Sequence, residues 1–218
     1  MELKGKKIVF LGDSITEGVG TSGEEATFVY QVGKAGGFRE SKNYGIGGTR
    51  IARQTKPTKD NPRFDLDFCS RVGELDEDAD IVVVFGGTND YGHGDARIGD
   101  FDSRELTTFY GACHYLMLKL IGRYPGKPIV IVTPMHRDNE RDPKPGIPEE
   151  GVTLQTYVNI LREVAEYYSL PVLDLFAESG LQPAVPAIHD RYMPDGLHPN
   201  DAGHALLTEK FLAFLRKL

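Results

Sequence analysis

A serine follows an apolar run near the start of the chain, in the segment Lys7-Ile-Val-Phe-Leu-Gly-Asp-Ser14. At the tip of a buried strand, just before a predicted helix, the Ser14 hydroxyl and its own backbone N–H can both face a reaction site. Such a serine can act as a nucleophile and as an oxyanion donor. The alternative is that Asp13, Ser14 and Thr16 only satisfy a turn or cap a helix, which is the commoner role of these residue types.

A carboxylate stands three residues before a histidine near the other end of the chain, in the segment Pro194-Asp-Gly-Leu-His-Pro-Asn200. In a turn, this spacing lets Asp195 accept the Nδ1 proton of His198 and leaves Nε2 to take the proton of a serine. Alternatively, Asp195 caps the helix that is predicted to begin near Asp201, and His198 is an ordinary surface residue. The pair by itself favours this second interpretation.

Glycine-rich segments follow two further apolar runs, Asn43-Tyr-Gly-Ile-Gly-Gly-Thr49 and Phe85-Gly-Gly-Thr-Asn-Asp90. A backbone N–H from the first segment and the Asn89 side-chain amide from the second could converge on the oxyanion that forms when a serine attacks a carbonyl. Each donor of this kind contributes roughly 3 kcal/mol. The glycines could instead serve a turn that needs positive φ, and Asn89 could cap a helix.

The elements that must position these residues alternate along the chain. Short runs rich in β-branched residues predict five parallel strands, at 7–11, 41–44, 80–85, 128–133 and 170–175. Apolar residues at helical spacing predict helices at 24–34, 66–75, 103–124, 153–168 and 201–218. This alternation predicts an α/β fold, a three-layer α/β/α sandwich, with its site at the carboxyl ends of the strands. Long loops at 91–102 and 136–151 leave the same edge and could act as lids.

Length and composition limit the classes of function. The 218 residues, 40% of them hydrophobic, predict a single domain over 1–218 without a membrane-inserted stretch. A net charge of -7 with mixed signs argues against nucleic acid as a partner. Cys69 and Cys113 are expected to be buried free thiols. The absence of a leader-like start favours a cytoplasmic location by default, with export left open. The oligomeric state is not indicated.

Together, the four segments resemble the SGNH hydrolase family, also called the GDSL family. The motifs that carry the resemblance occur in the family's order over nearly the whole chain: Gly12-Asp13-Ser14-Ile15, Gly48, Gly87-Thr88-Asn89-Asp90 and Asp195-Gly196-Leu197-His198-Pro199. The resemblance implies that Ser14 is nucleophile and oxyanion donor, that Gly48 and Asn89 supply the other two donors, and that Asp195 and His198 complete the triad. It also implies a flavodoxin-like sheet of five parallel strands.

The chain departs from the family's pattern at two points. Ile15 replaces the usual leucine after the serine, a volume-conserving change of small expected effect. The doublet Gly47-Gly48 leaves the identity of the oxyanion donor open. The spacing from Asn43 favours Gly48, and Gly47 is the alternative.

The expected reaction is hydrolysis of a carboxylic ester through an acyl-enzyme. Because the two long loops are charged and poor in large apolar residues, a short acyl group such as acetyl on a polar or carbohydrate alcohol is the first hypothesis. A lysophospholipase or thioesterase acting on longer chains is the alternative, and an inactive carbohydrate-binding protein on the same fold is a third. Asp13, Thr88 and His136 are candidate substrate-binding residues. No metal and no cofactor are expected, because no spacing singles out a metal.

Overall fold

A five-stranded parallel sheet forms the centre of the molecule. The computed structural model describes residues 1–59, 61–144 and 146–218. The strands are β1 (Lys7–Gly12), β2 (Glu40–Gly45), β3 (Ile81–Phe85), β4 (Ile129–Val132) and β5 (Val172–Leu173), in the order β2-β1-β3-β4-β5. This arrangement confirms the predicted five-stranded, flavodoxin-like parallel sheet.

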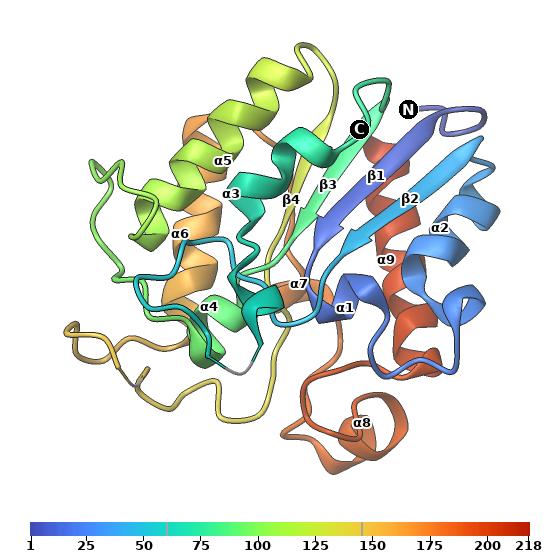
Figure 1. Ribbon diagram of the computed structural model, residues 1–218. Helices are drawn as coiled ribbons and strands as arrows, with labels where there is room; N and C mark the ends of the chain where they lie inside the picture. Colours follow the sequence, from blue (N-terminus) through green and yellow to red (C-terminus); the bar gives the residue numbers. More distant parts are fainter. Residues whose placement is uncertain (60, 145) are drawn as a thin grey trace.

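Helices cover both faces of the sheet because its strands are apolar on both faces. Alternate residues of β1 and β3 enter two separate hydrophobic clusters, Val9, Leu11, Val82 and Val84 on one face and Ile8, Phe10, Ile81 and Val83 on the other. The first face is covered by α3 (Phe68–Arg71), α5 (Phe109–Arg123) and α6 (Leu154–Tyr167), and the second by α2 (Phe28–Gly36) and α9 (Asp201–Lys217) (Figure 1). The predicted three-layer sandwich is therefore confirmed.

Several element bounds differ from those expected. The helix expected at 103–124 begins only at Phe109, because Thr108 caps it by accepting the Gly111 N–H. The predicted strand 170–175 shrinks to the two residues of β5, next to Pro171, which has no N–H for a ladder. The helix expected at 66–75 divides into α3 and the 3₁₀ turn η3 (Val72–Glu74).

Short helices account for most of what periodicity missed. They are α1 (Ser14–Glu17), η2 (Pro62–Asp65), α4 (Thr88–His93), α7 (Leu175–Glu178) and α8 (Pro186–Tyr192), whereas η1 (Glu24–Ala26) falls within the helix expected at 24–34. One or two turns give too few residues for an apolar stripe to be recognised. The predicted loop 91–102 therefore starts three residues too early, since 91–93 are the end of α4. The predicted loop 136–151 is irregular where it is described, and its residue 145 lies outside the described residues.

The carboxyl ends of the three neighbouring strands β2, β1 and β3 are aligned at one edge of the sheet. In the ladder, Gly12 of β1 pairs with Gly45 of β2 and with Phe85 of β3. The connections that follow these ends bring α1 and α4 together at that edge, near α7 (Figure 1). Strand order reverses between β1 and β3, and in open α/β sheets such a switch point forms a crevice at the carboxyl ends.

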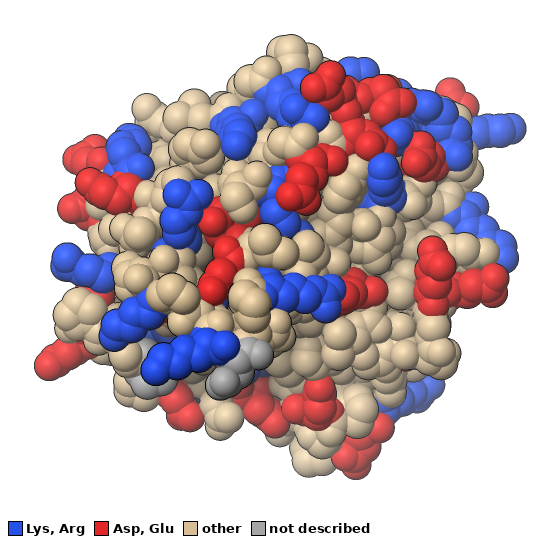
Figure 2. Space-filling model, in the orientation of Figure 1, with Lys and Arg blue, Asp and Glu red and all other residues tan. Residues whose placement is uncertain are grey.

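The surface carries charges of both signs. On the face shown in Figure 2, basic and acidic side chains are interspersed over most of the surface. Among the helices described, none is both long enough and apolar enough to cross a bilayer.

Candidate active site

Ser14, His198 and Asp195 form a continuous hydrogen-bonded chain. The Ser14 Oγ lies 2.9 Å from His198 Nε2, and His198 Nδ1 lies 2.7 Å from Asp195 Oδ2. Ser14 lies 184 positions from His198 in the sequence, whereas Asp195 and His198 are three positions apart. The fold therefore brings together the two motifs that the sequence singled out separately, with the atoms ordered as proton transfer from a serine requires.

The Asp195 carboxylate is held by its own turn. Its Oδ1 accepts the N–H groups of Leu197 at 2.9 Å and His198 at 2.6 Å, which leaves Oδ2 to the imidazole. Partial burial opposes the charged form, but these three hydrogen bonds outweigh it and keep the pKa of Asp195 below its usual range. The carboxylate is thus ionised and fixes the imidazole with Nδ1 protonated and Nε2 facing Ser14.

Ser14 is the first residue of α1, directly after the end of β1. Asp13 caps this helix by accepting the Ile15 N–H at 3.1 Å. Behind it, the buried guanidinium of Arg71 donates to the carbonyl oxygens of Gly12 at 3.0 Å and Tyr44 at 2.8 Å, so it ties the ends of β1 and β2 together. Sequence reasoning missed Arg71, which is the one basic residue of the predicted helix 66–75 but shares that stretch with Asp67 and Glu74.

The two glycines that compete as oxyanion donor have different surroundings. The Gly47 N–H donates to Glu17 Oε2 at 2.7 Å, so it is already engaged. The Gly48 N–H has no acceptor among the described residues. Gly48 also has φ of +77°, and a Cβ there would lie 2.2 Å from Phe64, so only glycine fits. This geometry favours Gly48.

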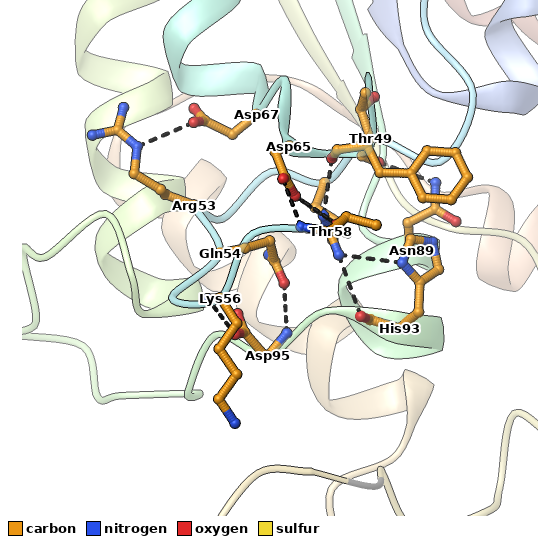
Figure 3. A network of polar contacts seen from close by, with 12 residues as sticks. Thr49, Arg53, Gln54, Lys56, Thr58, Asp65, Asp67, Asn89, His93 and Asp95 are labelled. Carbon is orange, nitrogen blue, oxygen red and sulfur yellow. Dashed lines mark hydrogen bonds and ion pairs between the residues drawn. The ribbon is translucent and has the colours of Figure 1, made fainter. Parts of the chain in front are cut away.

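Asn89 lies in the first turn of α4, next to the same loop. Its Nδ2 donates one hydrogen to Thr49 O at 3.0 Å, and the second amide hydrogen remains for another acceptor (Figure 3). Asp90 accepts the N–H groups of Ile51 and Ala52, each at 2.9 Å. Both side chains therefore fasten the segment after Gly48 to α4.

Two carboxyl groups are buried beneath this part of the site. Burial raises the pKa of Asp13 to about 7, and the neighbouring charge of Asp90 adds to the effect. Burial also raises the pKa of Asp90 to about 6, against the hydrogen bonds from Ala52 and Ile51. Both side chains are at most 3% exposed, and they support the backbone around Ser14 and Asn89.

A polar network fixes the loop between Gly48 and α3, as Figure 3 shows. The Asp95 carboxylate accepts the backbone N–H groups of Thr55 and Lys56, both at 2.8 Å. The Asp65 carboxylate accepts a hydrogen bond from Arg50 Nη2 at 2.9 Å. Arg50 Nη1 donates to the carbonyl oxygen of His93 at 3.3 Å. Sequence reasoning missed this network, whose partners lie up to 43 residues apart. It holds the loop that carries Gly48 and Phe64 against α4.

The loop after β4 contacts the Asp195 turn from the other side. The Asp138 N–H donates to Gly196 O at 2.8 Å. His136 is half-buried, binds Glu140 through Nδ1 at 2.8 Å, and stacks on Phe176 with ring centroids 4.1 Å apart. A cavity of about 370 Å³ is lined by His136, Glu140 and Gln182, among others. Most of the residues that line it carry a charged or an amide side chain.

The remaining candidate substrate-binding residue, Thr88, precedes Asn89 and is buried. Its carbonyl oxygen and its hydroxyl both lie within 3.3 Å of Arg137 Nη1. The structure thus adds Arg137 to the site, a residue that sequence reasoning did not single out although it follows His136 directly. Among the described residues, no cluster of three or more His, Cys, Asp or Glu side chains is arranged to hold a metal ion.

Comparisons with known proteins identify the family and the fold. A model of the GDSL-like lipase/acylhydrolase family matches residues 10–206. A solved structure 33% identical in sequence has a TM-score of 0.84, with 100% of this chain and 99% of the other covered. A protein from Lactobacillus plantarum is 28% identical, with a TM-score of 0.82 and 98% of each chain covered. No match was found among curated proteins.

A more distant structure adds a described activity. It is a two-domain esterase active on acetylated mannans, crystallised with mannopentaose, and is 24% identical with a TM-score of 0.61. The match covers 99% of this chain and 50% of that chain. At this identity the likeness shows a shared fold.

Proposed function

Since this chain belongs to the GDSL-like lipase/acylhydrolase family, we propose that it is a serine esterase in which Ser14, His198 and Asp195 form the catalytic triad. The observation that carries the proposal is the chain of hydrogen bonds from Ser14 Oγ through the imidazole to the Asp195 carboxylate, at 2.9 Å and 2.7 Å. Nucleophile, base and orienting carboxylate stand in the relation that acyl transfer requires.

In the proposed mechanism, His198 Nε2 takes the proton of Ser14 as Oγ attacks the ester carbonyl. The oxyanion of the tetrahedral intermediate accepts hydrogen bonds from the N–H groups of Ser14 and Gly48 and from the Asn89 amide. The imidazolium then gives its proton to the leaving alkoxide, and an acyl-enzyme remains. Water, deprotonated by His198, attacks the acyl carbonyl and releases the acid, while Asp195 stabilises the imidazolium in both half-reactions.

The proposed substrate is a short acyl group, such as acetyl, on a polar or carbohydrate alcohol. The cavity beside the Asp195 turn supports this, because charged and amide side chains line it. The described activity of the two-domain esterase on acetylated mannans is consistent with such a substrate. A preference for longer acyl chains would instead need an apolar groove next to Ser14.

A Ser14→Ala variant tests the triad. Its kcat for ester hydrolysis should fall by roughly 10³ or more, since the nucleophile is lost while the fold is retained. Ser22→Ala is the matched control, because Ser22 lies at the same edge but bonds to Asp201 instead. A fluorophosphonate that reacts with serine nucleophiles should label wild type and the control but not Ser14→Ala. Equal hydrolysis by the two variants would exclude Ser14 as the nucleophile.

Rates on p-nitrophenyl esters from acetate to decanoate test the acyl group. A maximum at acetate or propionate is expected. A maximum at octanoate or beyond would contradict the short-acyl proposal and favour a lysophospholipase or thioesterase.

A further inference from the structure

Phe64 lies directly against the loop that carries the proposed oxyanion donor. A Cβ on Gly48 would run into the Phe64 ring, so the ring packs on the bare Cα of this glycine. Gly47 packs on Ser14, since a Cβ on Gly47 would lie 3.6 Å from the Ser14 Cβ. The Phe64 ring and the proposed nucleophile thus contact the same pair of glycines.

The Phe64 ring is held in place by the buried Arg50 and by His93. Arg50 Nη2 donates to Phe64 O at 3.0 Å, which fixes the backbone of η2. Arg50 Nη1 donates to His93 Nδ1 at 3.3 Å, and the His93 and Phe64 rings are in contact, with centroids 5.5 Å apart. Phe64 itself remains half-exposed. The ring is therefore fixed in position, with part of its surface left to contact a substrate.

A second anchor ties η2 to the helix that begins with Ser14. Arg63, which precedes Phe64, forms an ion pair with Glu17 of α1. The other oxygen of this carboxylate, Glu17 Oε2, accepts the Gly47 N–H at 2.7 Å. Glu17 follows Ser14 by three residues, so one carboxylate fastens the nucleophile's helix, the glycine loop and η2 to one another.

Phe64 and His93 together form an uncharged wall. A guanidinium has no acceptor, so Arg50 must donate to His93 Nδ1, and that nitrogen therefore carries no proton. Burial of part of the ring and the charge of Arg50 lower the pKa of His93 to about 4, which agrees with a neutral imidazole. A hydrocarbon group, such as the methyl of an acetyl, would thus meet a neutral aromatic surface on this side of the site.

Phe64 and His198 approach Ser14 from opposite sides of the sheet. Phe64 lies just before α3, which covers the first face, and His198 lies just before α9, which covers the second (Figure 1). In the proposed mechanism, the imidazole must lie beside the alkoxide that it protonates, and the oxyanion points to its donors. The remaining substituent of the tetrahedral carbon is the acyl chain. It is therefore directed away from His198, toward the side of Phe64.

We propose that Phe64 limits the length of the acyl group, because its ring ends the space on the acyl side of Ser14. This inference rests on the proposed esterase function and names the side chain that selects acetyl over longer chains. Phe64 is a specificity-determining residue and takes no part in the proton transfers.

Phe64→Ala and Phe64→Trp test the wall in opposite directions. The readout is the ratio of kcat/KM for p-nitrophenyl butanoate to that for the acetate, so a loss that affects both esters equally cancels. In Phe64→Ala this ratio should rise by roughly 10-fold or more, since each of the two added methylenes contributes about fourfold once it is buried. In Phe64→Trp the ratio should fall at least about threefold, because the larger ring shortens the space.

Phe38→Ala is the matched control. Phe38 is also half-buried, but it lies just before the amino end of β2, at the opposite edge of the sheet. Its ratio should equal that of wild type. A rise in Phe64→Ala together with a fall in Phe64→Trp supports the inference, and if Phe64→Ala does not fold, the ratio in Phe64→Trp decides. An unchanged ratio in the folded Phe64 variants, a change in the same direction in both, or an equal change in Phe38→Ala overturns it.

The esterase proposal and the inference fail in different ways. If wild type hydrolyses neither ester, the esterase function is wrong and the inference falls with it. If wild type hydrolyses the acetate but the Phe64 variants keep its ratio, the inference is wrong and the esterase function stands. A wild-type ratio well above 1 would show that the acyl side is open, and would overturn the inference together with the short-acyl proposal.

Discussion

The Asp195 turn and the loop after β4 lie side by side but differ in how completely their polar groups are used. Both oxygens of Asp195 are occupied, by two backbone N–H groups and the His198 imidazole. In the neighbouring loop, Arg137 retains a buried Nε without a partner among the described residues. The hydrogen bonds of the turn are thus all formed before substrate arrives, whereas the loop keeps one buried donor without a partner, as do Arg50 and Arg71 at their Nε atoms. We propose that the turn serves the reaction.

The largest effect on kcat should come from a substitution in the Asp195 turn. Asp195→Asn retains Oδ1 for the two backbone N–H groups but places an N–H donor opposite His198 Nδ1. The imidazole must then carry its proton on Nε2, which can no longer accept the serine proton. We expect kcat to fall by roughly 10³ to 10⁴, with little change in KM.

The chain supplies a matched control for this variant. His189 and Asp190 form a second histidine–carboxylate contact, at 3.1 Å, on exposed α8. Asp190→Asn should leave kcat within a factor of about two. If both variants lost activity equally, the special role of the Asp195 turn would be refuted, and circular dichroism would show whether folding is the cause.

A smaller effect is expected at Asn89, which lies on α4 next to Thr88, the residue that Arg137 contacts. Asn89→Ala removes one proposed oxyanion donor, so kcat should fall by roughly 10² to 10³. The variant also loses the bond to Thr49 O, which should lower the free energy of unfolding by about 1 kcal/mol. Asn159→Ala, on α6, is the control for kcat. A loss of stability with unchanged kcat would make Asn89 a purely structural link.

Sequence reasoning singled out the proposed catalytic residues more readily than the side chains that fix the surrounding loops. Ser14, Gly48 and the Asp195–His198 pair lie at strand ends or in a short motif, where residue type and local spacing carry the information. Arg71, Arg137 and the Arg50–Asp65 network escaped, because their roles depend on packing between segments far apart in the chain. The bounds of the short helices α1 and α4 could not be predicted for another reason. The Asp13 cap holds α1 and the tertiary contacts of Asn89 and Asp90 hold α4, and periodicity does not reveal such contacts.

Asp13 provides the last test. The sequence made it a candidate for substrate binding, but the structure buries it next to Ser14. Its pKa, about 7 in the folded chain, is 3.8 in the unfolded chain, so the folded state binds the extra proton between these values. The contribution of Asp13 to the free energy of unfolding therefore decreases as pH rises, since it is complete below about pH 3.8 and is lost as the pH passes about 7. Asp13→Asn cannot bind this proton. As the pH rises, the free energy of unfolding of the variant should therefore increase relative to that of wild type, by up to about 1.4 kcal/mol per pH unit. Urea denaturation between about pH 4 and pH 8 measures it. Parallel curves for the two proteins would mean that Asp13 ionises normally, and would return it to the groups available to a substrate.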